Sequence, residues 1–135
     1  MRRALAGLLA VGLLAGCGAP SADLFVVTRS GKDRNANLKL LVSDDGTVTC
    51  NGGKRTPISN ETLLRARELE RDLSEQAELH LVLPPGPNAV LSYRVRMQAG
   101  TLGFADTSRP LPDAFARLTA FTSDVTEREC GIVRP

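Results

Sequence analysis

The sequence is poor in the residues and motifs on which familiar catalytic sites depend. It has a single histidine, His80, and no Cys-x-x-Cys pair. It also lacks a Gly-x-Ser-x-Gly elbow, a Ser-x-x-Lys pair, a His-Glu-x-x-His metal motif and a phosphate-binding glycine loop. These absences disfavour familiar hydrolase and nucleotide chemistry, and they disfavour a zinc site. We therefore expect a protein that is not an enzyme and that uses no cofactor and no metal.

The chain also lacks an excess of charge of one sign. Its formal net charge of +2 comes from Arg2 and Arg3, because the sequence from residue 17 onward holds fifteen Lys plus Arg and fifteen Asp plus Glu. Non-specific nucleic-acid binding requires a positive field over a large surface. This composition cannot supply such a field across a whole face, so no nucleic-acid partner is expected. It leaves room for a local basic patch.

No apolar run is long enough to cross a membrane. The longest, Ala4 to Ala15, has about twelve residues, whereas a helix needs about twenty to span the hydrocarbon core. It follows the basic pair Arg2-Arg3 and ends in small residues, as export signals do. Its end, Leu14-Ala15-Gly16-Cys17, resembles the lipobox of bacterial lipoproteins.

The lipobox resemblance implies a lipid-anchored protein on the outer face of a cell membrane. In that family the Cys17 thiol would receive a diacylglyceryl group and the chain would be cut after Gly16. We thus expect a signal peptide over 1–16, a flexible tether over 17–22 and a single globular domain over 23–135. The alternatives are an ordinary signal peptide followed by a chance cysteine, or an N-terminal helix of a cytosolic protein.

Assigning Cys17 to lipid leaves Cys50 and Cys130 as a pair. An exported domain folds in an oxidising compartment, so an even residual count predicts a disulfide. The rival interpretations are two buried free thiols, or part of a metal site whose other ligands are absent.

The hydrophobic pattern predicts an α+β fold. Apolar or alternating runs predict five strands, near residues 24–28, 38–42, 48–50, 91–97 and 102–104. The first run is apolar throughout, as in a strand that is covered on both faces. Two amphipathic stripes predict helices, one that begins after Ser59 or Asn60 and one that begins near Pro112 and ends at Gly131. We expect a two-layer sandwich with both helices on one face of a largely antiparallel sheet.

Three surface features are candidates for a binding site. The loop Pro84-Pro85-Gly86-Pro87 is the most distinctive, because its prolines stiffen it and a rigid loop loses little entropy on binding a partner. The alternative is that it is only a rigid connector between two elements. Arg94 and Arg96 share one face of a strand, where they mark a partner surface or only keep the sheet soluble. Asp44-Asp45-Gly46 reads as a hairpin turn rather than as a calcium loop.

The order of several segments is similar to that of secreted subtilisin-inhibitor-type proteins. The segments are Thr49-Cys50, a Gly-Gly turn followed by a proline, a helix, a proline-containing loop, Ser92-Tyr93-Arg94 in a hairpin, and a last helix. The resemblance covers most of residues 38–130, and it implies a rigid protease-binding loop near 82–88. The chain lacks the family's loop cysteines and differs in its disulfide partner, so no reactive residue is carried over.

These observations favour a non-enzymatic binding or interaction domain of the cell envelope. Its sheet face or its proline loop would bind a protein or another envelope component. One alternative is protease inhibition through residues 84–87. Another is an enzyme with an unfamiliar site that uses His80 and Asp106.

Overall fold

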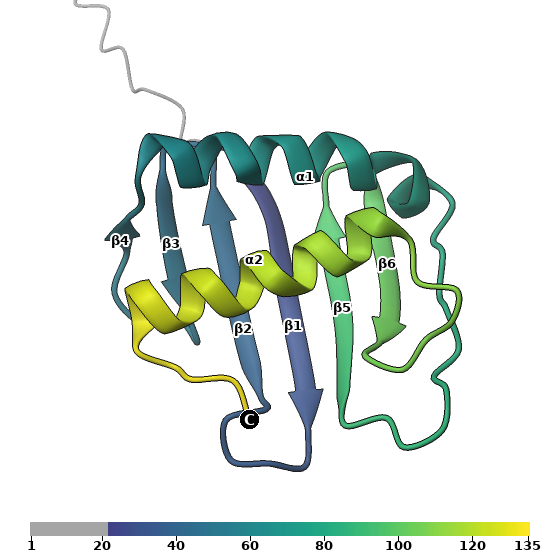
Figure 1. The fold of residues 1–135 in the computed structure, drawn as a ribbon. Coiled ribbons are helices and arrows are strands. Elements are labelled where there is room, and N and C mark those ends of the chain that lie inside the picture. The colour runs from purple at the N-terminus through teal and green to yellow at the C-terminus, as the bar shows by residue number, and fades with distance from the viewer. Residues whose placement is uncertain (1–21) are drawn as a thin grey trace, which may run out of the picture.

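The computed structural model describes residues 22–135, which form one antiparallel sheet and two helices (Figure 1). The sheet has the strand order β4-β3-β2-β1-β5-β6. The strands are β1 (Asp23–Gly31), β2 (Leu38–Ser43), β3 (Thr47–Cys50), β4 (Thr56–Pro57), β5 (Leu91–Met97) and β6 (Gly100–Ala105). The helices are α1 (Asn60–Glu78) and α2 (Asp113–Cys130). The predicted α+β class is confirmed, with six strands rather than five. Residues 1–21, which include Cys17 and most of the expected tether, lie outside the described part.

The sixth strand and a longer first strand are the main differences from the expected pattern. Thr56 pairs with Val48 inside a segment that sequence signals mark as turn-forming. The neighbouring Pro57 is tolerated because β4 is an edge strand. β1 continues to Gly31, although the polar residues 29–35 are typical of a loop, because it pairs with β5 as far as Leu91. Sheet pairing on both sides of β1 thus overrides the local composition.

The core lies between the sheet and the helices. Alternate strand residues point into it, and the burial pattern of β5 follows this period of two without a break. Figure 1 shows α2 crossing the strands and α1 running along their ends. The helices bury nearly all of the expected stripes, with Leu63 of the first stripe only half-buried. The buried residues are Ala66, Leu69, Leu73 and Ala77 of α1 and Phe115, Leu118, Phe121, Thr122 and Val125 of α2. Both helices therefore cover the same face of the sheet, as the pattern predicts.

The helix ends follow the local signals. Ser59 caps α1, and its hydroxyl accepts a hydrogen bond from the backbone N–H of Thr62 at 3.1 Å. Pro112 precedes the first turn of α2. Gly131 ends α2 in the left-handed conformation with φ 65°, which favours glycine because it has no Cβ.

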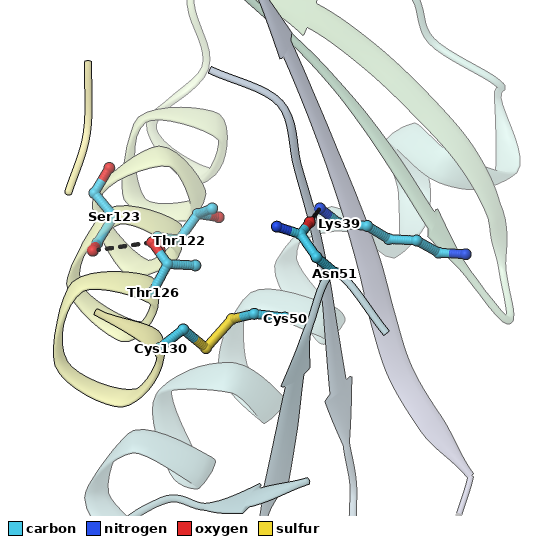
Figure 2. Close-up of a disulfide and its surroundings, with 7 residues drawn as sticks. All are labelled: Lys39, Cys50, Asn51, Thr122, Ser123, Thr126 and Cys130. Atoms are coloured by element: carbon cyan, nitrogen blue, oxygen red, sulfur yellow. Dashed lines mark hydrogen bonds between the residues drawn. A yellow bond between two sulfur atoms is a disulfide. The ribbon is translucent and has the colours of Figure 1, made fainter. Parts of the chain in front are cut away.

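A disulfide between Cys50 and Cys130 joins the end of β3 to the end of α2 (Figure 2). This confirms the predicted pairing of residues 80 apart in sequence. Next to it, Asn51 extends the pairing of β3 with β2, because its Oδ1 accepts a hydrogen bond from the N–H of Lys39 at 2.8 Å. The disulfide thus links the helical layer to the β3 side of the sheet.

Neither helix of the described segment is long and apolar enough to span a membrane.

Candidate functional site

The face of the sheet opposite the helices is the candidate functional site. We call it the open face, because no helix of residues 22–135 covers it. It consists of the outward residues of the five long strands. They are Thr47 and Thr49 of β3, Lys39, Leu41 and Ser43 of β2, Asp23, Leu24, Val26, Thr28 and Ser30 of β1, Ser92, Arg94 and Arg96 of β5, and Thr101, Gly103 and Ala105 of β6. The expectation that the first strand is covered on both faces is wrong, because no helix covers β1 on the open face. On that face Val26 is buried by its neighbours, and Thr28 is exposed.

The exposed Asp23 lies opposite Ser43 at the start of β1, and the other charges on the open face all have the same sign. They belong to Lys39, Arg94 and Arg96, which are exposed and take part in none of the ion pairs of residues 22–135. Thr28 pairs with Lys39 on one side and with Arg94 on the other, so these two cations lie two strands apart, or about 10 Å. Arg96 follows Arg94 by two residues, or about 7 Å. The three cations form a local basic patch of the kind that a neutral composition permits.

A groove of about 420 Å³ runs along the β6 side of the open face. Its lining includes Gly103, Thr101 and Arg94. Val82 and Pro85 also line it, and Val82 is 71% exposed. The segment Leu81 to Leu83 is held there by hydrogen bonds to the backbone of Gly103, both 2.9 Å. The lining of the groove thus combines apolar residues with one cation, Arg94.

The proline loop 84–87 borders this groove and is braced from behind. The Ser108 hydroxyl donates a hydrogen bond to the carbonyl of Pro84 at 2.9 Å, and the Thr107 hydroxyl donates one to the carbonyl of Gly86 at 3.1 Å. Ser108 is fully buried, so this support is part of the packed structure. The loop is therefore a supported element whose prolines, Pro84, Pro85 and Pro87, are exposed.

Tyr93 lies behind the groove with its side chain in the core, stacked on Phe104 with ring centroids 5.0 Å apart. Burial raises the pKa of the Tyr93 hydroxyl above its ordinary value of about 10, and the positive charges of Arg134 and Arg29 partly oppose this shift. The folded state therefore favours the neutral phenol.

We expect the free energy of unfolding to fall as the pH rises from about 10 upward, because the unfolded chain then releases the Tyr93 proton more readily than the folded chain. The contribution is fully present below pH 10. Urea unfolding at pH 9, 10 and 11 will measure it, with Tyr93→Phe as the variant that cannot ionise. The same decline in Tyr93→Phe would show that another group causes it.

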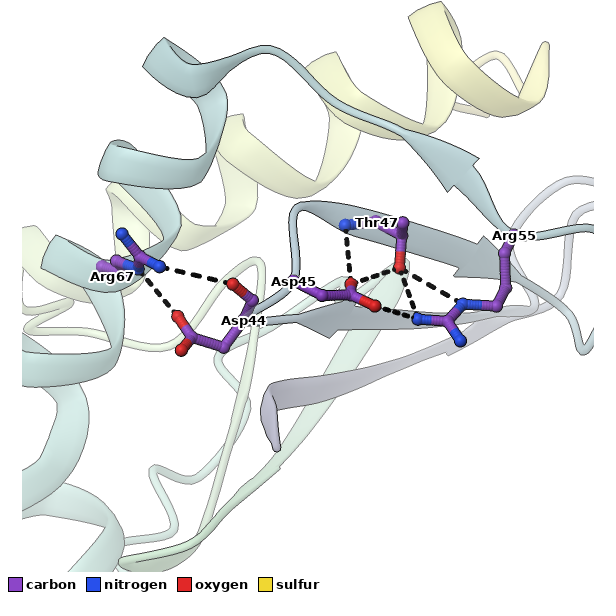
Figure 3. Close-up of polar contacts among 5 residues, drawn as sticks. All are labelled: Asp44, Asp45, Thr47, Arg55 and Arg67. Carbon is purple, nitrogen blue, oxygen red and sulfur yellow. Dashed lines mark hydrogen bonds and ion pairs between the residues drawn. The ribbon is translucent and has the colours of Figure 1, made fainter. Parts of the chain in front are cut away.

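The two aspartates of the β2–β3 turn are used in ion pairs (Figure 3). Asp44 accepts a hydrogen bond from Nε of Arg67 of α1 at 2.7 Å, and Asp45 pairs with Arg55 and with the Thr47 hydroxyl. The hydrogen bond from Thr47 lowers the pKa of Asp45, and the positive charge of Arg55 adds to this effect. Residues 22–135 contain no cluster of ligands able to hold a metal ion. The geometry fits a hairpin turn tied to its surroundings.

His80 and Asp106 do not form a joint site. Nδ1 of His80 lies 3.3 Å from the hydroxyl of Thr101, at the start of β6, and Asp106 follows the end of the same strand. The carboxylate of Asp106 accepts a hydrogen bond from the N–H of Val90 at 3.2 Å. Thr101 and Asp106 are five residue steps apart along an extended chain, which corresponds to about 17 Å. An acid–base pair of these two residues is therefore not assembled in the structure.

The sequence pattern missed Gly103, Val82 and Lys39 as parts of the site. The signal for Gly103 was present, because a glycine inside a strand often marks the close approach of another backbone. Here that backbone belongs to Val82 and its neighbours. Nothing local distinguishes Lys39 from other surface lysines, because its place beside Arg94 depends on the pairing of three strands.

Comparisons with protein-family models, curated proteins and solved structures found no match to this chain.

Proposed function

We propose that the protein is a lipid-anchored domain on the outer face of the cell membrane, where it works as a non-enzymatic binding domain whose binding surface is the open face of its sheet. The observation that carries the proposal is the open face itself, with its cations Lys39, Arg94 and Arg96 and the groove beside the proline loop. A site that combines an apolar lining with cations and has few acid–base candidates suits binding better than catalysis.

The anchoring part of the proposal depends on Cys17. Its support is the lipobox-like segment, together with the disulfide of the other two cysteines, which is the state expected in an oxidising compartment. Intact-mass analysis of the exported protein, before and after thiol reduction, tests it. We expect cleavage after Gly16, the added mass of a diacylglyceryl group with or without an N-acyl chain, and a gain of two hydrogens on reduction. Retention of the initial methionine, or unchanged membrane attachment in Cys17→Ser, would contradict the proposal.

The binding part can be tested by photo-crosslinking in cells. A photoreactive residue at Thr101, in the groove lining, should crosslink to an envelope component, protein or lipid. The same residue at Ala116, which is exposed on α2, serves as the matched control and should not. Equal crosslinking from both positions, or none from Thr101, would refute the open face as the binding surface.

Filling the groove should weaken this binding without loss of stability. A Cβ atom at Gly103 would lie 3.6 Å from the carbonyl oxygen of Tyr93 and 3.8 Å from the Val82 methyl groups, which are ordinary contacts. Gly103→Val should therefore fold normally, since a β-branched residue suits a strand better than glycine. We expect a free energy of unfolding within about 1 kcal/mol of the wild-type value. We also expect less crosslinking from Thr101. Undiminished crosslinking would show that the ligand does not enter the groove.

The braced proline loop supports a second candidate function, protease inhibition through residues 84–87. The hydrogen bonds from Ser108 and Thr107 hold two of its carbonyls in place. A panel of serine proteases assayed with the purified domain tests it. Inhibition that is lost in Pro85→Gly and retained in Gly103→Val would favour this function over binding at the groove.

A further inference from the structure

We propose that the open face lies against the surface of an anionic lipid bilayer. This inference rests on the proposed function, because it names the envelope component that the open face contacts. The lipid on Cys17 would hold the domain at the membrane, and the three cations of the open face would set its orientation. The distribution of charge between the two layers carries the proposal, and the place where the anchored segment joins the sheet is compatible with it, because the start of β1 borders both the open face and α1.

The charge of the domain is divided between its layers. The two helices carry ten acidic and five basic side chains, whereas the open face carries the cations Lys39, Arg94 and Arg96 and one acidic side chain, Asp23, at the start of β1. The arginines of α1 and α2 are largely occupied, because Arg65, Arg67, Arg117 and Arg128 form ion pairs. A negatively charged surface therefore repels the helical layer and attracts the open face.

The place of the anchored segment agrees with this orientation. Six residue steps separate Cys17 from Asp23, so the lipidated residue lies within about 20 Å of the start of β1 in any conformation. β1 is a central strand of the sheet and contributes Leu24, Val26 and Thr28 to the open face. Arg96 lies beside Val26, and Arg94 and Lys39 lie beside Thr28. All three cations are thus within about 17 Å of the attachment point along the strand.

The side chains around the cations favour contact with a flat surface. The neighbouring residues Thr28, Ser30 and Ser92 are short, so the longer side chains of Lys39, Arg94 and Arg96 are able to extend beyond them. The hydroxyls of Thr28, Ser30 and Ser92 can donate hydrogen bonds to phosphate oxygens of lipid headgroups. The exposed Val82 beside the groove adds an apolar contact at the interface.

Vesicle binding of the processed chain without lipid tests the inference. The protein begins at residue 17 and carries Cys17→Ser, so only the folded surface can hold it to a membrane. We expect it to sediment with vesicles of phosphatidylglycerol and phosphatidylcholine, and not with vesicles of phosphatidylcholine alone. Each cation near a charged surface changes the partition coefficient about fivefold, so Lys39→Gln with Arg94→Gln and Arg96→Gln should lower it about 100-fold. Raising the salt to about 1 M should abolish binding, because the screening length falls to about 3 Å.

A matched variant removes three exposed cations elsewhere, Lys54→Gln with Arg71→Gln and Arg128→Gln. It has the same net charge as the open-face variant, and its vesicle binding should stay within about threefold of the parent. An equal loss in both variants would overturn the inference, because it would show an effect of net charge alone. No binding to anionic vesicles, or binding to soluble polyglutamate but not to vesicles, would overturn it as well.

Failure of this inference is distinguishable from failure of the proposed function. Lipidation is measured from the mass of the exported protein. The open-face substitutions alter that mass only by the mass difference of the replaced side chains, so they do not obscure the added lipid. If the open face binds a protein instead, crosslinking from Thr101 yields a protein adduct while the vesicle assay stays negative. That result keeps the binding function and removes the bilayer as its partner.

Discussion

Replacing Cys50 and Cys130 together by alanine is expected to lower the free energy of unfolding by about 4 kcal/mol, and the midpoint of thermal unfolding by about 15–30 °C. The disulfide closes a loop of residues 80 apart in sequence. In the loop-entropy model, removing the link stabilises the unfolded chain, because that chain gains conformations that the closed loop had excluded. Most domains of this size have only 5–15 kcal/mol of net stability, so this one link supplies a large part of it.

The position of the disulfide adds to this expectation. Cys50 ends β3, and Cys130 ends α2, so the link holds the last helix to the β3 side of the sheet (Figure 2). Beside it, the hydroxyl of Thr126 donates a buried hydrogen bond to the carbonyl of Thr122 at 2.8 Å. Loss of the link should loosen the end of α2 first, and hydrogen exchange of the amides after Thr126 should rise before global unfolding.

Urea and thermal unfolding of the processed chain measure the effect, with Cys17→Ser in every sample so that lipid plays no part. Reduction of the disulfide in the protein that keeps both cysteines offers an independent control. The two cysteines are half-buried, and the reduced protein should lose as much stability as the alanine variant. A loss below about 1 kcal/mol would contradict the loop-entropy explanation. It would mean that the contacts of α2 with the core suffice to hold it.

Arg29→Ala should destabilise the fold about as strongly, by about 4 kcal/mol. Arg29 is 1% exposed and points toward the helices from β1. Its Nε donates a hydrogen bond to the carbonyl of Ala36 at 3.0 Å, and its Nη2 donates one to the carbonyl of Asn35 at 2.7 Å. The guanidinium therefore fixes the loop between β1 and β2, and its loss leaves carbonyl groups unpaired and a cavity beside Tyr93, its partner across the strands.

Arg29→Met separates the two contributions, because it keeps the apolar stem and removes the donors. We expect it to lose about 2 kcal/mol and to raise the hydrogen exchange of the Ala36 amide, which bonds to the carbonyl of Asp33 at 3.0 Å. Arg34→Ala, in the same loop but exposed, serves as the control and should change stability by less than about 0.5 kcal/mol. An Arg29→Met variant as stable as wild type would show that the hydrogen bonds of Arg29 add no net stability.

The elements with strong periodicity could be predicted from the sequence. The alternation of Leu91, Tyr93, Val95 and Met97 defines the buried face of β5, and the stripes of the two helices match the buried residues of the structure. The cysteine count with the export signal predicted the disulfide. The weak local signals failed, as in the turn-forming segment that contains β4, because a two-residue strand depends on its partner β3 rather than on its own composition.

The candidate site was predictable only in fragments. Arg94, Arg96 and the proline loop stood out in the sequence, but nothing local related one to the other. Arg29 reads as part of a charged loop and is instead among the largest fully buried side chains. A charged residue inside a strand can point to either face, and the register of the neighbouring strands decides which.

The sequence by itself determined the class of fold and the buried stripe of each helix, because these follow from the spacing of apolar residues along the chain. It also predicted the pairing of Cys50 with Cys130, because only two cysteines remain once Cys17 is assigned to lipid. Only the tertiary structure decided which sheet face stays uncovered, and that Lys39, Arg94 and the groove at Gly103 lie together on it. Strand order and register set these relations, and they arise from contacts between segments that lie far apart in the chain.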